Sequence, residues 1–320
     1  MRIAVVDVGT NTTRLYIAEV ADGHVTAELT RVSRVTRLGA GVDASGRLAE
    51  DALKREYAVL DEYQRTIQAA APARAVAVMT SAVRDAANGG GFADNVAARF
   101  GFDVHVISGD EEAQLTYRGA TDGTAPDPDG ARTLVFDIGG GSTELVLGHG
   151  ESVDFHVSTQ TGVVRQADRH IRSDPPSVSE LAAVAEDVRE VLAAAVPLDR
   201  RARPGRALGV AGTPTSLAAI AQELEPYDPA RVHGYKLSAA ERDRIYRRLA
   251  ALPLAARKQV RGLHPDRAIA ILPGIVILTA IMRLFGLAEI EVSEHDILRG
   301  AALHYAELSA TRAGDVQTQP

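Results

Sequence analysis

The segment from Asp137 to Glu144 contains the residue types that bind phosphate together with a divalent cation. An apolar run ends in Asp137, and three glycines, a serine and a threonine follow before Glu144. Consecutive glycines let the backbone turn sharply, and such a turn can direct several N–H groups at one anion. A carboxylate beside a bound phosphate requires a cation between them, so the pattern indicates a phosphate site with a metal ion. A β-hairpin that merely has a glycine-rich turn is the alternative interpretation.

A related segment lies at the N-terminus. Residues 7–15 align with residues 137–145, since Asp, Gly, Thr and Leu recur at the same positions and Thr12 matches Ser142. Each segment follows one apolar strand and precedes another. We expect a duplicated α/β unit whose two phosphate-binding turns face each other across a cleft between domains, where pockets commonly lie. Coincidence between two glycine-rich hairpins is the less economical explanation.

The elements that must position these turns alternate along the chain. The apolar periodicity predicts strands over 2–8, 14–20, 25–35, 73–79, 103–107, 152–158, 206–210 and 290–292. It predicts helices over 48–69, 92–100, 109–117, 163–171, 178–195, 239–251 and 268–285, and a closing helix that ends near Leu308.

A linker of turn-forming residues over 121–130 divides the chain. We expect an N-terminal domain over 1–122, a C-terminal domain over 123–310 whose last helix can pack back on the first domain, and a disordered tail over 311–320.

The amino-acid composition argues against several classes of partner and of site. The 320 residues carry a net charge of −7, which disfavours nucleic acid and anionic membranes as partners, and they include no cysteine, which excludes disulfides and thiolate metal sites. The longest apolar segment, 268–287, contains Pro273 and Arg283, so we expect a buried helix and a cytoplasmic protein.

A third small-residue turn, Ala211–Thr215, follows another predicted strand. Three such turns are typical of the actin-like, ribonuclease-H-type (ASKHA) fold of ATPases and sugar kinases. The glycine-lysine motif of P-loop proteins does not occur, so phosphate binding of that kind is excluded.

Several motifs together resemble the exopolyphosphatase/guanosine pentaphosphate phosphohydrolase (Ppx/GppA) family. The matching segments are residues 7–12, 107–115, 136–146, 209–213 and 292–300. The element Ser108-Gly109-Asp110-Glu111-Glu112-Ala113 is the one that distinguishes this family from kinases of the same fold. The resemblance implies two duplicated actin-like domains and hydrolysis of a terminal phosphoanhydride with Mg²⁺, or with Mn²⁺ as the alternative ion.

The resemblance also implies roles for individual residues. Glu112 matches the base that activates water, Arg84 matches an arginine of the family site, and Asp137 matches a metal-binding carboxylate, with Glu144 and Asp7 as further metal ligands. The expected phosphate-binding residues are Gly9, Thr10, Asn11, Thr12, Gly139, Gly140, Gly141, Ser142, Gly212 and Thr213. Without the resemblance, Glu111 and Glu112 read as an acidic first turn that favours the helix dipole, and Arg84 reads as a surface ion pair.

The leading hypothesis is a homodimeric enzyme that releases orthophosphate from inorganic polyphosphate. We expect a preference for short chains, because the last predicted domain ends near residue 310, and the additional helical domain that the resemblance implies for longer relatives does not follow it. Hydrolysis of guanosine pentaphosphate (pppGpp) is the alternative with the same chemistry. An actin-like ATPase or kinase, and a sensor that binds (p)ppGpp without turnover, are the alternatives of other classes.

Overall fold

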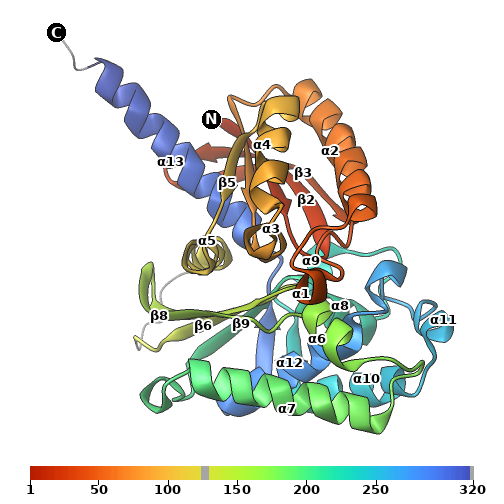
Figure 1. Cartoon of the computed structure of the whole chain (residues 1–320). Coiled ribbons are helices and arrows are strands. Elements are labelled where there is room, and N and C mark those ends of the chain that lie inside the picture. The colour runs from red at the N-terminus through yellow and green to blue at the C-terminus, as the bar shows by residue number, and fades with distance from the viewer. Residues whose placement is uncertain (124–129, 318–320) are drawn as a thin grey trace. The chain divides into compact units, whose positions relative to one another are not determined.

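The computed structural model describes residues 1–123 and 130–317, which form two compact units (Figure 1). The first unit comprises Met1–Thr124 and Asp296–Pro320, and the second comprises Ala125–His295. Most of the predicted linker, residues 124–129, lies outside the described residues.

The first unit is a five-stranded sheet with helices on both faces. Its strands run in the order β3-β2-β1-β4-β5, where β1 pairs antiparallel with β2 and parallel with β4. The strands are β1 (Arg2–Val8), β2 (Thr12–Ala21), β3 (His24–Val35), β4 (Arg74–Met79) and β5 (Asp103–Val106). The helices are α1 (Val42–Ser45), α2 (Glu50–Ala70), α3 (Ser81–Asp85), α4 (Gly89–Phe100), α5 (Gly109–Thr121) and α13 (Ile297–Gln317).

Alternation along β1 explains why this sheet needs helices on both faces. Ala4, Val6 and Val8 pack with α2 and α4, whereas Ile3 and Val5 pack in a second cluster with α13. Successive side chains of a strand point to opposite faces, so a strand with four consecutive apolar residues, as β1 has over residues 3–6, is buried on both sides.

The second unit is a six-stranded sheet with the order β10-β11-β9-β6-β7-β8. Its strands are β6 (Thr133–Ile138), β7 (Thr143–His149), β8 (Ser152–Thr159), β9 (Arg206–Val210), β10 (Lys236–Ser238) and β11 (Glu289–Val292). Its helices are α6 (Val163–His170), α7 (Val178–Ala195), α8 (Gly212–Ala221), α9 (Pro229–Val232), α10 (Ala239–Ala250), α11 (Leu254–Arg257) and α12 (Ile271–Leu284), with short 3₁₀ segments at Leu198–Arg200 and Pro265–Arg267.

The two sheets have the same topology. The order β8-β7-β6-β9-β11 repeats β3-β2-β1-β4-β5, with the antiparallel and parallel pairings in the same places. The short strand β10 is added at the edge of the second sheet. The predicted duplication of an actin-like α/β unit is therefore confirmed.

The end of the closing helix differs from the expectation. Helix α13 continues to Gln317, past Leu308 and into the segment 311–320 that was expected to be a disordered tail, of which residues 318–320 lie outside the described residues. No proline occurs between Leu308 and Gln317, and only one glycine does, so nothing in the backbone stops the helix. The short elements α1, α3, α9, α11 and β10 span too few residues to show a period in the sequence.

In the described part of the chain, every helix is too short or too polar to cross a bilayer.

Helices α5 and α13 approach each other through glycine. A Cβ atom added at Gly300 would lie 1.7 Å from the backbone oxygen of Leu115, and one added at Gly119 would lie 2.0 Å from that of Asp296. Because backbone atoms of packed helices cannot yield to a side chain without moving the whole helix, these positions require glycine.

We therefore expect Gly300→Ala to lower the free energy of unfolding by about 3 kcal/mol, at the upper end of overpacking costs. The control is Gly91→Ala on the surface of α4, where an added Cβ has no atom within 4 Å. That change should raise stability by at most about 1 kcal/mol, since alanine is the better helix former. Denaturant unfolding measures both, and equal effects would contradict the packing argument.

Candidate functional site

The turn between β1 and β2 is held in place by hydrogen bonds to its carbonyl groups. The carbonyl of Asn11 accepts hydrogen bonds from the N–H groups of Thr36 (3.1 Å) and Arg37 (3.0 Å), and the carbonyl of Thr10 accepts one from Gly39 (2.8 Å). In a planar trans peptide the N–H points opposite to the C=O. The N–H groups of Asn11 and Thr12 are therefore directed away from the segment after β3, as an anion-binding turn requires.

The turn between β6 and β7 is built in the same way. Gly139 donates its N–H to the carbonyl of Ser142 (3.0 Å), just as Gly9 does to that of Thr12 (3.2 Å). The carbonyls of Gly139 and Gly140 accept the N–H groups of Val163 (3.0 Å) and Val164 (2.8 Å) at the start of α6. The N–H groups of Gly140 and Gly141 consequently point away from α6.

The two turns differ in the residue that faces their aspartate across the strand ladder. Asp7 pairs with Arg14, whereas Asp137 pairs with Glu144. Arg14 donates from Nε to Oδ2 of Asp7 (2.8 Å), and its Nη2 lies 2.6 Å from the same oxygen. One copy therefore provides a cation beside its aspartate, and the other places a second carboxylate there.

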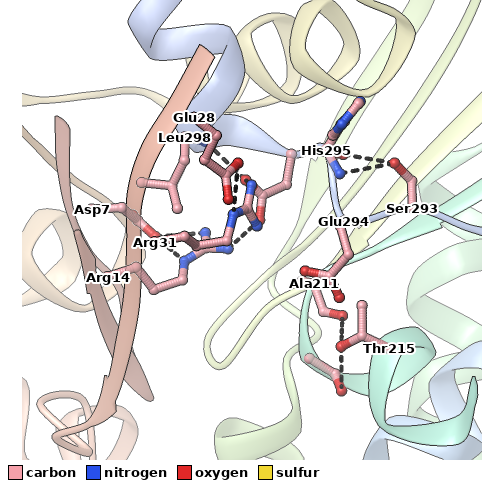
Figure 2. Close-up of polar contacts among 12 residues, drawn as sticks. Asp7, Arg14, Glu28, Arg31, Ala211, Thr215, Ser293, Glu294, His295 and Leu298 are labelled. Atoms are coloured by element: carbon pink, nitrogen blue, oxygen red, sulfur yellow. Dashed lines mark hydrogen bonds and ion pairs between the residues drawn. The ribbon is translucent and has the colours of Figure 1, made fainter. Parts of the chain in front are cut away.

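Arg14 also contacts Asp296, the residue at which the chain returns to the first unit. Figure 2 shows Asp7, Arg14, Arg31 and Glu28 in this cluster, with Leu298, whose N–H donates to Asp296 Oδ1 (3.0 Å). Burial raises the pKa of Asp7, and the opposing effect of Arg14 only partly offsets it. Burial also acts to raise the pKa of Asp296, but Arg14 and Arg31 outweigh it and hold that pKa below its usual range.

Asp137 and Glu144 lie side by side and are nearly inaccessible, with exposed fractions of 6% and 1%. Ser158 donates from Oγ to Oε1 of Glu144 (2.7 Å), which fixes that side chain. Facing carboxylates on adjacent strands repel each other, and a divalent cation relieves that repulsion. Over residues 1–123 and 130–317, no group of three or more His, Cys, Asp or Glu side chains has the arrangement of a metal site. Two carboxylates suit Mg²⁺, which retains several waters.

Arg84 and Glu112, both predicted to act in catalysis, lie together in the first unit. Arg84 Nη1 donates to Glu112 Oε2 at 3.4 Å and to the carbonyl of Ile107 at 2.9 Å. Glu112 is 8% exposed at the start of α5. A buried carboxylate beside a guanidinium is an arrangement that can accept a proton and stabilise phosphoryl charge.

Glu111, the neighbour of Glu112, serves the helix. Its Oε2 accepts the N–H of Ser108 (2.8 Å), while Ser108 Oγ accepts the N–H of Glu111 (3.1 Å), which forms a capping box. The hydrogen bond from the Ser108 backbone lowers the pKa of Glu111. These contacts leave Glu112 as the better candidate for chemistry.

Some predicted phosphate ligands have other contacts. The hydroxyl of Thr10 lies 2.8 Å from that of Ser81, the first residue of α3. Thr213 is packed beneath α12, because an added Cβ at Gly274 would lie 2.2 Å from its Oγ1. No local pattern in the sequence indicates either contact, since both join segments that are far apart in the chain.

The third turn begins α8 and involves an arginine that sequence reasoning missed. Arg267 Nη1 donates to the carbonyl of Gly212 (3.3 Å) and to Ser216 Oγ (3.2 Å). Ala211 has a φ of 65°, the left-handed region that non-glycine residues rarely adopt, and its carbonyl accepts the hydroxyl of Thr215 (2.9 Å; Figure 2). Strain of this kind occurs preferentially at functional sites.

Known proteins resemble this chain in sequence and in fold. The Ppx/GppA phosphatase family matches residues 16–304. The chain belongs to that family. The curated protein Exopolyphosphatase 2 of Mycobacterium tuberculosis is 39% identical over 322 aligned residues, which cover 95% of this chain and 98% of that protein.

Two further relatives have the same fold or family. The crystal structure of the Aquifex aeolicus Ppx/GppA family member superimposes with a TM-score of 0.80 at 30% identity, covering 97% of this chain and 98% of that one. A guanosine-5'-triphosphate,3'-diphosphate pyrophosphatase of Vibrio atlanticus is 26% identical over 99% of this chain and 61% of its own length.

A buried carboxylate of α2 in this Ppx/GppA chain was not among the predicted site residues. Glu56 of α2 is fully buried, and the Thr13 hydroxyl, at the end of the first turn, lies 2.7 Å and 2.8 Å from its two carboxylate oxygens. Tyr63, also on α2, donates its hydroxyl to the carbonyl of Thr13 (2.8 Å). Burial raises the pKa of Glu56 to about 7. The sequence analysis assigned no role to Glu56, because its partner Thr13 lies 43 residues away in the chain.

The raised pKa of Glu56 predicts a pH-dependent stability. Between about pH 4.5 and pH 7 the folded state binds more protons at Glu56 than the unfolded state, so this contribution to stability is lost as pH rises through 7. Glu56→Gln cannot ionise. Its stability relative to wild type should therefore increase from pH 5 to pH 8, by up to about 3 kcal/mol.

Denaturant unfolding at both pH values measures this change. Glu62→Gln is the matched control on the same helix, because its half-exposed carboxylate makes a surface pair with Arg34 that contributes little. A pH-independent difference between Glu56→Gln and wild type would contradict the prediction.

Proposed function

We propose that this Ppx/GppA protein is an exopolyphosphatase that removes orthophosphate from the end of inorganic polyphosphate. The observation that supports this most directly is the buried Glu112 beside Arg84, next to a helix cap that already employs Glu111. The relative named Exopolyphosphatase 2 matches over nearly its whole length, which favours the same activity here.

In the proposed reaction, Glu112 accepts a proton from a water molecule whose oxygen attacks the terminal phosphorus. The bond between that phosphorus and the bridging oxygen breaks, and the shortened chain leaves as an anion. Arg84 offsets the negative charge that builds up on the transferred group. The N–H groups of the turns at residues 9–12 and 139–142, with Gly212 and Thr213, bind the non-bridging oxygens. Positioning and charge neutralisation dominate phosphoryl transfer, and these are the tasks that we assign to these groups.

Asp137 and Glu144 are the residues we propose to hold Mg²⁺, with Mn²⁺ as the alternative ion. When bound, the ion neutralises phosphate charge. Asp7 was predicted as a third ligand, and in the structure Arg14 is its partner. The charge of Asp7 is therefore already offset by a guanidinium. Asp137 faces a second carboxylate, so it is the better candidate for a metal ligand.

Guanosine pentaphosphate is the second candidate substrate. Its terminal phosphoanhydride would break in the same way, and the Vibrio relative is named for a guanosine polyphosphate. Arg267 at the third turn adds a guanidinium that the sequence had not assigned. A homodimer stays a prediction from the family resemblance.

Glu112→Gln tests the proposed base. Because an amide cannot accept the proton, we expect kcat on polyphosphate to fall by about 10²–10⁴-fold while KM changes little. Phosphate release from polyphosphates of graded length, pppGpp and ATP measures the effect and the substrate preference together. Glu111→Gln is the matched control, since glutamine also completes a capping box, and it should retain activity.

Full activity of Glu112→Gln would show that another group is the base. Binding of pppGpp without phosphate release by the wild-type protein would favour the sensor, and turnover of ATP alone would favour the ATPase.

Glu144→Gln tests the metal site. Losing one of two facing carboxylates should raise the Mg²⁺ concentration for half-maximal activity by about 10-fold or more, the scale of one charged contact. Calorimetric titration with Mg²⁺ or Mn²⁺ provides a readout independent of turnover. Asp7→Asn is the comparison: an equal shift would establish Asp7 as a ligand, and an unchanged ion affinity would assign it to Arg14 alone.

A further inference from the structure

In the glycine turn of the second unit, backbone N–H groups hold two of the three carbonyls, and a side chain holds the third. The carbonyls of Gly139 and Gly140 are held by the N–H groups of Val163 and Val164, and Arg165 adds a longer bond from its own N–H to Gly140 (3.3 Å). The carbonyl of Gly141 is held differently. It accepts a hydrogen bond from Nε of the Arg165 side chain at 2.9 Å.

The start of α6 is built against this turn. A Cβ atom added at Gly162, the residue before the helix, would lie 2.4 Å from the backbone of both Gly140 and Gly141. Only glycine allows this approach, which brings the first residues of α6 and the Arg165 side chain within reach of the turn. Arg165 is half-buried there, one helical turn before the exposed Arg169.

The orientation of the Gly141–Ser142 peptide therefore depends on a side chain. This peptide contributes the N–H of Ser142, and a planar peptide directs that N–H opposite to the carbonyl. We propose that Arg165 is a positioning residue, which holds the Gly141 carbonyl so that the Ser142 N–H joins those of Gly140 and Gly141 in binding one phosphate group. This proposal rests on the proposed phosphate chemistry and adds a residue to it.

Arginine is suited to this task in a way that lysine is not. Its guanidinium is planar and keeps Nε in a fixed direction, whereas the lysine ammonium is a mobile point charge. Removing Arg165 leaves the Gly141 carbonyl without this donor, so the peptide can rotate and withdraw the Ser142 N–H. The Gly140 and Gly141 N–H groups should remain in place, because backbone donors of α6 hold their peptides.

The test uses the full-length protein and imidodiphosphate with Mg²⁺, a diphosphate analogue whose P–N–P bridge resists hydrolysis. Calorimetry compares wild type with Arg165→Gln, Arg165→Lys and the matched control Arg169→Gln, which lies on the same helix and removes a pair with Asp187. We expect Arg165→Gln to weaken binding about 10-fold, the scale of one hydrogen bond to a charged group. Arg165→Lys should recover only part of this loss, and Arg169→Gln should bind within about twofold of wild type, as for a surface pair.

Amide NMR of glycine- and serine-labelled protein provides the decisive readout. In the wild type, imidodiphosphate should shift the amide signals of Gly140, Gly141 and Ser142. In Arg165→Gln the Ser142 shift should disappear while the two glycine shifts persist. Retention of the Ser142 shift, or full recovery of affinity by Arg165→Lys, would overturn the proposal, since Arg165 would then contribute charge alone.

These outcomes separate the inference from the proposed function. A wild-type protein that binds imidodiphosphate with all three shifts but hydrolyses no polyphosphate would refute the exopolyphosphatase and leave the role of Arg165 intact. A wild-type protein that does not bind the analogue would overturn both. Loss of the thermal unfolding transition in Arg165→Gln would show a structural role instead, and would overturn the positioning role as well.

Discussion

An anion-binding turn must satisfy its carbonyl groups while it leaves its N–H groups to the ligand. Both units meet this requirement in the same way, because the segment that follows the third strand of each sheet donates hydrogen bonds to the turn carbonyls. In the first unit that segment is 36–39, and in the second it is 163–165. The direction of the N–H groups in each turn is therefore set by residues on the opposite side of the turn, which need not touch substrate. These segments must approach the turns closely to form the hydrogen bonds, so glycine is required at Gly39 and Gly162.

The duplicated turns have diverged at one position with a clear electrostatic consequence. Asp7 and Asp137 occupy equivalent places at the ends of β1 and β6, but the facing residue is Arg14 in one and Glu144 in the other. An arginine opposite an aspartate gives a pair whose net charge is zero, whereas two facing carboxylates repel each other. The two turns therefore differ in their electrostatics: the first has a fixed cation beside its aspartate, and the second has the carboxylate pair that we propose to hold a metal ion.

The sequence predicted the strand order of neither sheet but did predict the repeat that makes the sheets equivalent. Long apolar strands and the helices α2, α7 and α12 were recognisable, since their periodicity extends over many residues. The choice of Arg84 and Glu112 as site residues followed only from the family resemblance, and their contact with each other was not predicted. The contacts of Thr13 with Glu56, Thr10 with Ser81 and Arg267 with Gly212 could not be predicted. Each joins segments that only the folded chain brings together, and no local pattern encodes such a contact.

The cluster around Asp296 shows how a buried charge can help to specify the position of a helix, here α13. Desolvation makes buried ion pairs poor sources of stability, although removing one partner is strongly destabilising. Asp296 accepts the N–H of Leu298 at the start of α13 and contacts Arg14 of β2. The bond from Leu298 is local to the start of α13, whereas the contact with Arg14 joins this end of the helix to β2, in the same placement in which Gly300 meets Leu115 of α5. Charge and close packing thus favour the same position for the helix, and Arg14 connects that position to Asp7 beside the first turn.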